Sequence, residues 1–331
     1  MYERITVLVV ACLGLAGFGA LGGAFEAAIA RDAGGAASLA AGPALHGQAG
    51  VGTALRVASE AATAQRRSIR ALAIRFPGSA VSKLVYEGKY FASTNDFMAH
   101  HVPRAGYHDA THSAEVSALA YDLAKRRGLT DDDALFLSEV GLVHDFDPAR
   151  PAGSPARVAA TRELLGDLAK RMGWDERRRL MAGAIIERTM HPFDEAQAAV
   201  YEGLVRRLNP RDRRFVLREA PILSEYADKG GNYMLRTFET AHRKVVALAR
   251  EIDPTGKLKP ADLNTGAFLD GIGRAQAFAM DHAVARRVLG SAEGLFELSR
   301  DRLGALAPEF IHRLEVNMSL FDAVLRPTKA E

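Results

Sequence analysis

The stretch GLTDDDALFLSEVGLVHDFD, residues 128–147, decides the fold class. It opens with a glycine, the residue that most often ends a helix, and Thr130 with Asp133 forms a capping-box pattern for the next helix. The near-continuous apolar run LFLSEVGLV then leads directly to His144 and Asp145. We therefore expect a buried helix that ends with an imidazole and a carboxylate where the chain leaves the core.

Similar helix signals recur along the rest of the chain. Gly173 is a second expected helix stop, and Asn209 with Pro210 supplies an N-cap followed by proline at the first helical position. Apolar residues with i, i+3, i+4 spacing occur in ARVAATRELLGDLAKRM (156–172), RRLMAGAIIERTM (178–190), RRFVLREAPILSEYA (213–227) and AHRKVVALAREI (241–252). Only the short stretch SKLVYEGKYFAS (82–93) has a strand-like pattern. The sequence therefore predicts an all-α protein with one domain over residues 56–331.

The N-terminal segment differs in composition from the helical body. Residues 5–25 carry no charge, and Ala28-Ile29-Ala30 has the form of a cleavage site. Because about 20 apolar residues can span a bilayer, we expect residues 1–30 to be a signal peptide or an N-terminal membrane anchor, with a buried core helix as the alternative. Residues 31–55 are rich in Ala and Gly and are expected to form a flexible tether. The protein is then either exported or attached to the membrane through residues 5–25.

Composition narrows both the function classes and the available metal ligands. The 331 residues include 43 Lys and Arg against 40 Asp and Glu, and both signs are interspersed, giving a net charge of +3. This is not the charge pattern of a protein that binds nucleic-acid polymers, and the runs 177–179 and 213–214 are interpreted as solvated helix faces. Cys12 is the only cysteine and lies in the N-terminal segment. Any metal in the folded domain must therefore be held by His and carboxylate groups.

Four places in the chain carry residues suited to site chemistry. They are His108 with His112 one helical turn later, His144 with Asp145, Glu187 with His191, and Asp228 before two glycines. Burying a carboxylate at the end of an apolar helix is costly unless a cation or hydrogen bonds compensate. Two histidines and two aspartates from three helices would give a divalent metal a shell of nitrogen and oxygen, and imidazole suits zinc or iron.

These motifs resemble those of the HD metal-dependent phosphohydrolase superfamily, and in particular its class I cyclic nucleotide phosphodiesterase branch. That branch carries Y-H-N-x-x-H-A-x-D-V, matched by YHDATHSAEV at 107–116, and H-D-x-D-H, matched by HDFD at 144–147. Three looser matches are IIERTMHPFD (185–194), ADKGGN (227–232) and TGAFLDGI (265–272). The resemblance covers roughly residues 105–290 and implies an HD-domain, phosphodiesterase-like compact helical domain as the catalytic unit.

The resemblance also implies a ligand set and a proton donor. The implied ligands of a first metal, zinc or iron, are His112, His144, Asp145 and Asp228. Asp145 would bridge to a second ion, Mg²⁺ or Mn²⁺. A metal-activated water would attack phosphorus, and His108 would act as general acid for the leaving oxygen. The substrate would be a small phosphoester.

Other residues are implied to contact the substrate or to support the ligands. These are Asp109, Glu115, His191, Thr265 and Phe268. Asp109 or Glu115 would orient an imidazole through its second ring nitrogen. The chain departs from the family pattern at Asp109 (Asn in the family), Glu115 (Asp), Pro148 (a His that helps hold the second metal's water) and Thr265 (the purine-reading Gln). Phe268 keeps the ring-stacking aromatic.

Three interpretations of function remain open at this point. The first is a phosphodiesterase, with a 3′,5′-cyclic nucleotide as one possible substrate. The second is an HD phosphohydrolase that acts on another phosphate ester, such as a nucleotide monophosphate, and the absence of the purine-reading glutamine favours it. The third is a degenerate, metal-binding HD domain that serves as a sensor or interaction module. Pro148 favours the third interpretation, whereas the intact proton donor and ligand set oppose it.

Overall fold

The computed structural model describes residues 48–101, 106–146, 161–190, 193–253, 255–257, 272–295 and 300–325. All regular secondary structure in these ranges is helical, so the prediction of an all-α, compact helical domain is confirmed. The predicted signal or anchor at 1–30 lies outside the described residues. Among the helices that the structure describes, none combines the length and apolar character that a membrane span requires.

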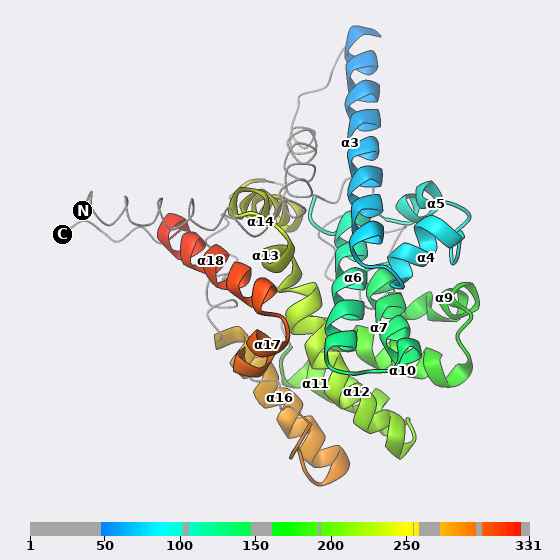
Figure 1. Ribbon diagram of the computed structural model, residues 1–331, viewed down its shortest axis with the longest axis vertical. Coiled ribbons are helices and arrows are strands. Elements are labelled where there is room, and N and C mark those ends of the chain that lie inside the picture. The colour runs from blue at the N-terminus through cyan, green and yellow to red at the C-terminus, as the bar shows by residue number, and fades with distance from the viewer. Residues whose placement is uncertain are drawn as a thin grey trace, which may run out of the picture.

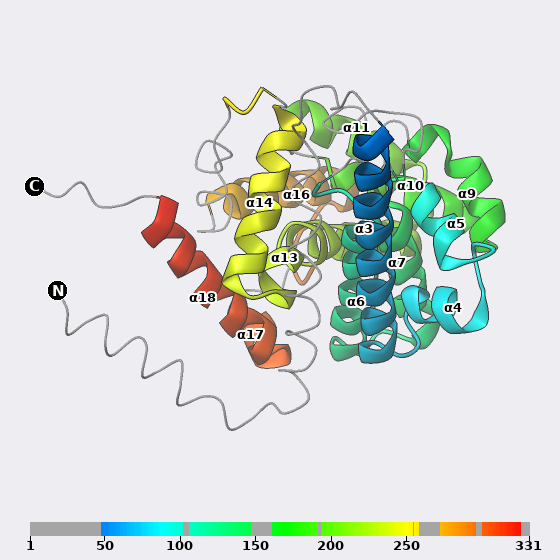
Figure 2. The same cartoon turned by 90° about the horizontal axis from the view of Figure 1, so that it is seen from above.

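An antiparallel helix pair forms the centre of the fold (Figures 1 and 2). Helix α6 (Ala110–Arg126) packs along α7 (Asp131–Val143), and Ser138 Oγ donates a hydrogen bond to the Ser117 carbonyl at 2.8 Å. Gly141 allows the close approach, because a Cβ atom there would lie only 3.1 Å from backbone atoms of Val116 and Ser117. The first turn of α6 is consequently held beside the last turn of α7.

Three helices on the N-terminal side cover this pair. Helix α3 (Gln48–Arg75) lies alongside α6 in both views, and it is followed by α4 (Ala80–Glu87) and α5 (Thr94–Ala99) (Figures 1 and 2). The last eight residues of the predicted tether, 48–55, belong to α3. The remainder of the predicted tether lies outside the described residues.

The strand-like interpretation of residues 82–93 is wrong. Residues 80–87 form α4, with the Ser79 side chain accepting from the Ser82 amide at the start and Gly88 in the left-handed conformation (φ 62°) at the end. Such paired caps stabilise a short helix. Val81 and Leu84 are one turn apart and buried in the core, so tertiary packing outweighs the local alternation of polar and apolar residues.

The central part of the chain contributes a layer of helices next to α7. They are α9 (Leu165–Met172), α10 (Glu176–Arg188), α11 (Glu195–Arg206) and α12 (Pro210–Ile222). The expected end and start signals are confirmed: Gly173 caps α9 at φ 72°, and Asn209 caps α12 with Pro210 in its first turn. The run 177–179 lies at the start of α10, where its arginines form ion pairs at the surface.

The remaining helices pack against α6, against α11 and α12, and against one another. Helix α12 continues into a π-helix, η1 (Leu223–Asp228), followed by α13 (Gly231–Leu235) and α14 (Phe238–Ile252). The C-terminal helices are α16 (Ile272–Leu289), α17 (Arg300–Leu306) and α18 (Pro308–Leu325). Because α6, α7, η1 and α14 all end or begin near one another, four separate segments of the chain can contribute to a single site.

Candidate metal centre

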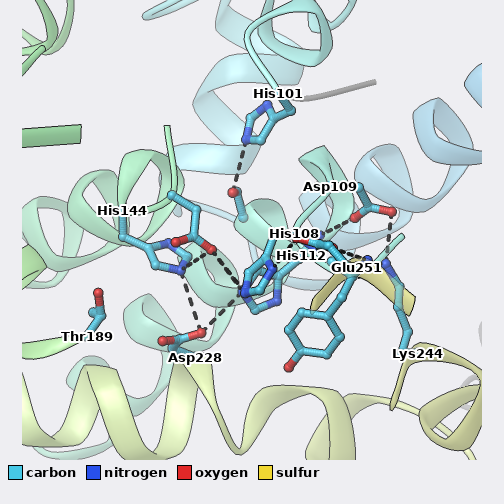
Figure 3. Close-up of polar contacts among 12 residues, drawn as sticks. His101, His108, Asp109, His112, His144, Thr189, Asp228, Lys244 and Glu251 are labelled. Carbon is cyan, nitrogen blue, oxygen red and sulfur yellow. Dashed lines mark hydrogen bonds and ion pairs between the residues drawn. The ribbon is translucent and has the colours of Figure 1, made fainter. Parts of the chain in front are cut away.

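The start of α6 carries the two histidines that lie one turn apart. Asp109 is the N-cap of this helix, and its Oδ1 accepts from the His112 amide at 2.9 Å. Lys244 of α14 donates to Asp109 Oδ2 at 2.8 Å and so fixes the cap from outside. The rings of His108 and His112 then lie 5.5 Å apart and face the same space (Figure 3).

The end of α7 contributes a histidine and an aspartate. His144 Nδ1 lies 2.8 Å from the Gly141 carbonyl oxygen, which can only accept, so Nδ1 carries the proton. The other ring nitrogen, Nε2, is thereby left as a lone-pair donor directed into the site. Glycine at 141 therefore has two functions, because it permits the close contact of α6 with α7 and its carbonyl orients His144.

The third segment is the π-helix η1, whose last residue is Asp228. Proline at 221 removes one amide donor near the end of α12, and the Lys229 amide donates to the Ser224 carbonyl, five residues back, at 3.1 Å. Gly230 is required directly after this turn, because a Cβ atom there would lie 2.8 Å from the Tyr226 carbonyl oxygen. Short π-helical turns are uncommon and frequently lie at functional sites.

The four predicted ligands converge in one buried cluster, of which Figure 3 labels His112, His144 and Asp228. His112 Nε2 lies 3.2 Å from Asp228 Oδ1, and His144 Nε2 lies 3.2 Å from Asp145 Oδ2. The two crossed pairs, His112 with Asp145 and His144 with Asp228, are each 3.6 Å apart. Within the described part of the chain, neither buried Nε2 atom makes a hydrogen bond.

These separations fit two or more ligands of one cation. Ligand atoms that each lie about 2.1 Å from an ion, at the tetrahedral angle, are about 3.4 Å apart. The observed values of 3.2 to 3.6 Å bracket that distance. His112, His144 and Asp228 form one group of potential ligands, and His108, His112 and Asp145 form a second that shares His112. The cluster can therefore hold a metal ion.

The electrostatics of the cluster also favour a cation. Burial acts to raise the pKa of Asp145 and of Asp228, but the adjacent imidazoles outweigh burial and hold both pKa values below their ordinary range. Burial acts to lower the pKa of His144, yet the two carboxylates raise it well above its ordinary value. The buried carboxylates thus require neighbouring positive charge, which a divalent cation can supply in place of protons.

His108 occupies a different environment from the other two histidines. Its Nδ1 lies 2.8 Å from Glu251 Oε1, and its Nε2 lies 3.9 Å from Asp145 Oδ2. Glu251 Oε2 also accepts from the backbone amides of Tyr107 and His108 at 3.1 and 3.3 Å. A carboxylate whose side chain is only 1 % exposed thus fixes both the loop and the ring of His108, which is itself 26 % exposed.

The predicted supporting acids have other partners. Glu115 does not orient an imidazole but forms a buried ion pair with Arg236, and Asp109 binds the His112 amide and Lys244 instead of a ring nitrogen. Glu251 takes the predicted role for His108, and the sequence contains no signal for it. It lies 143 residues away, in an amphipathic helix where a glutamate is ordinarily solvated.

The other predicted residues lie beside the cluster or outside the described residues. Glu187 pairs with Arg162 at 2.6 Å, whereas His191, Thr265 and Phe268 lie outside the described residues, as do Asp147 and Pro148. His101 was not predicted. It is buried between the Phe97 carbonyl and Ser113 Oγ, at 3.0 Å from each, and burial lowers its pKa to about 4 (Figure 3).

Comparison of the chain with protein-family models, with curated proteins and with solved structures found no match.

Proposed function

We propose that this chain is a metal-dependent phosphoric ester hydrolase of the phosphodiesterase-like HD type. In this proposal His112, His144, Asp145 and Asp228 hold the first metal, and His108 is the general acid. The observation that carries the proposal is the meeting of two imidazole Nε2 atoms and two carboxylates at ligand spacing, beside a third imidazole that this set does not need. This third imidazole is 26 % exposed and its Nε2 lies 3.9 Å from Asp145 Oδ2, so it can serve as a proton donor beside the first metal.

The donor set favours particular metals. Two imidazoles with two carboxylates suit zinc or iron, which we propose for the first site. Asp145 also faces His108, and on that side we propose a second, more oxygen-rich ion, Mg²⁺ or Mn²⁺. When bound, such ions polarise a phosphoryl oxygen and lower the pKa of water, so that hydrolysis can proceed at neutral pH.

The chain's own residues would direct the proton transfer. Because Glu251 engages Nδ1 of His108, Nε2 is the ring nitrogen that can carry a proton toward a leaving oxygen. A general acid in this position contributes typically about 10²- to 10⁴-fold to the rate. The buried Tyr107 ring lies 4.9 Å from both His108 and His112 and shields one side of the imidazoles from water.

Two substrate classes remain within this proposal. A 3′,5′-cyclic nucleotide is the first, and another phosphate ester, such as a nucleotide monophosphate, is the second. They differ in whether the scissile phosphorus carries two ester bonds or one. Measuring turnover on both, together with bis(4-nitrophenyl) phosphate as a diester with a good leaving group, separates the two classes.

Two histidine variants test the proposal in the full-length protein. His112→Ala should lower bound zinc, thermal stability and turnover together, because it removes a ligand. His108→Ala should keep the zinc content but lose at least about 10²-fold in turnover on an ester with a poor leaving group, and less on the nitrophenyl ester. His312→Ala is the matched control, because His312 is an exposed imidazole on α18.

Two results would contradict the proposal. If wild-type protein bound no divalent metal and hydrolysed no phosphoester, the site would have another function. If His108→Ala lost as much metal as His112→Ala, His108 would be a ligand and the proposed acid would be absent.

A further inference from the structure

A second group of charged side chains is buried beside the metal centre and is not used in the mechanism above. We define the Arg188 cluster as Arg188 of α10, Glu225 of η1, Lys229 after η1 and Asp281 of α16. Arg188 is fully buried, as is Glu225, and Asp281 is 1 % exposed. Burial of so many charges is costly unless each charge is paired.

The guanidinium of Arg188 makes four hydrogen bonds within and beside the cluster. Arg188 Nε and Nη2 donate to the two oxygens of Asp281, each at 2.8 Å. Its Nη1 donates to Glu225 Oε1 at 3.0 Å and to Ser224 Oγ at 3.1 Å. The Phe193 ring lies 4.0 Å from the guanidinium carbon. Such bidentate, ring-stacked arginine geometry is specific and cannot be reproduced by a point charge.

Two members of the Arg188 cluster lie in and directly after the π-helical turn that carries Asp228. Glu225 precedes Asp228 by three residues, and Lys229 follows it immediately. Lys229 Nζ donates to Glu225 Oε1 at 2.9 Å, so the ion pair spans the turn on both sides of Asp228. The same Glu225 oxygen accepts from Arg188, which links the turn to α10 and α16.

The direction of the Asp228 side chain depends on this turn keeping its π-helical form. An α-helix advances about 100° per residue, so loss of the extra residue that a π-helical turn accommodates would rotate every later side chain by about that angle. Asp228 Oδ1 would then no longer lie 3.2 Å from His112 Nε2.

We propose that the Arg188 cluster positions Asp228 for metal binding by holding η1 in its π-helical form. Asp281 and Arg188 are then positioning residues that act through Glu225 and touch neither metal nor substrate. This inference rests on the proposed metal site. It adds an explanation of how the direction of the Asp228 side chain is set.

The test compares the metal affinity of full-length cluster variants with that of a control variant that also alters a buried acid. Asp281→Asn and Glu225→Gln keep the side-chain shape and remove one negative charge from the cluster. Lys229→Met is a third, milder variant, because Lys229 is 11 % exposed. The matched control is Glu139→Gln, since Glu139 is also a buried acid, held at 2.8 and 2.6 Å by Tyr90 and Trp174, neither of which belongs to η1.

Metal binding is measured with Co²⁺, whose visible spectrum reports the number and geometry of its ligands. We expect the three cluster variants to bind Co²⁺ about 10- to 100-fold more weakly and with an altered spectrum, which is the usual effect of removing support from a ligand. Glu139→Gln should keep the wild-type affinity and spectrum despite its lower unfolding temperature.

The possible failures are distinguishable. Unchanged affinity and spectrum in the folded Asp281→Asn and Lys229→Met proteins would overturn the inference, and so would equal weakening in Glu139→Gln. Asp228→Ala serves as the reference for the site itself. If its affinity equalled that of wild type, Asp228 would not be a ligand, and the proposed metal site would fail together with the inference.

Discussion

Substitution of Gly141 by alanine tests whether the close contact of α6 with α7 positions the proposed metal ligands. A Cβ atom at 141 would lie 3.1 Å from the Ser117 Cα and N atoms and the Val116 carbonyl carbon. Because all three are backbone atoms, neither helix can relieve the overlap by a side-chain rotation. The helices must instead move apart by a few tenths of an ångström.

The magnitude follows from two opposing contributions to the free energy of unfolding. Overpacking a core of this kind costs about 1–3 kcal/mol, whereas replacing glycine by alanine inside a helix gains about 1 kcal/mol. The net effect at 141 is therefore a loss of about 0–2 kcal/mol. Gly203→Ala in α11 has the same propensity gain and no atom within 4 Å of the new methyl group. It should raise the free energy of unfolding by about 1 kcal/mol.

The difference between the two variants isolates the packing cost. Urea unfolding of the metal-free proteins should place Gly141→Ala about 1–3 kcal/mol below Gly203→Ala. Zinc should also bind Gly141→Ala more weakly, because His112 and His144 move with the two helices. The reasoning would be refuted if Gly141→Ala matched Gly203→Ala in both stability and zinc affinity.

Two further predictions concern residues that the sequence did not reveal. Glu251→Gln should reduce turnover on esters with poor leaving groups at least about tenfold and leave the zinc content unchanged, because Glu251 orients His108 and is not itself one of the proposed ligands. Loss of zinc would contradict this role. Burial holds the pKa of His101 at about 4 against about 6.5 in the unfolded chain, so below pH 6.5 the unfolded state binds this proton preferentially. The free energy of unfolding should fall by about 3 kcal/mol as the pH drops from 6.5 through 4, and His101→Gln should show a smaller fall when both are followed by urea titration.

The helical fold could be predicted because its signals are local, and the proposed ligands were pointed to by short motifs and by the resemblance that those motifs carry. Thr130, Gly173 and Asn209 mark helix ends through contacts within a few residues, and such contacts depend little on the rest of the chain. His144 and Asp145 directly follow an apolar run, so their position at the edge of the core follows from the sequence. The alternation of polar and apolar residues at 82–93 did not indicate the correct structure, because the stretch is short. Tertiary packing decides the secondary structure of such stretches.

The supporting residues could not be predicted because their partners are distant in the sequence. Glu251 meets His108 across 143 residues, and Arg188 meets Asp281 across 93. Each of these charged side chains is unremarkable in its own helix, and only the folded arrangement makes it a buried partner. The π-helical turn also could not be predicted from the sequence. Pro221 indicates that α12 is interrupted, but it does not indicate the direction of the Asp228 side chain.

The contacts that orient the proposed ligands also affect how tightly the site can bind a metal. Three of the four proposed ligands each have their own source of orientation: the Asp109 cap for His112, the Gly141 carbonyl for His144, and η1 for Asp228. These restraints come from contacts within the protein, so the ligand atoms already lie 3.2 to 3.6 Å apart in the fold itself. A site arranged in this way pays less ordering entropy when a cation binds. The supporting contacts should therefore contribute, together with the ligands, to how tightly the metal is held.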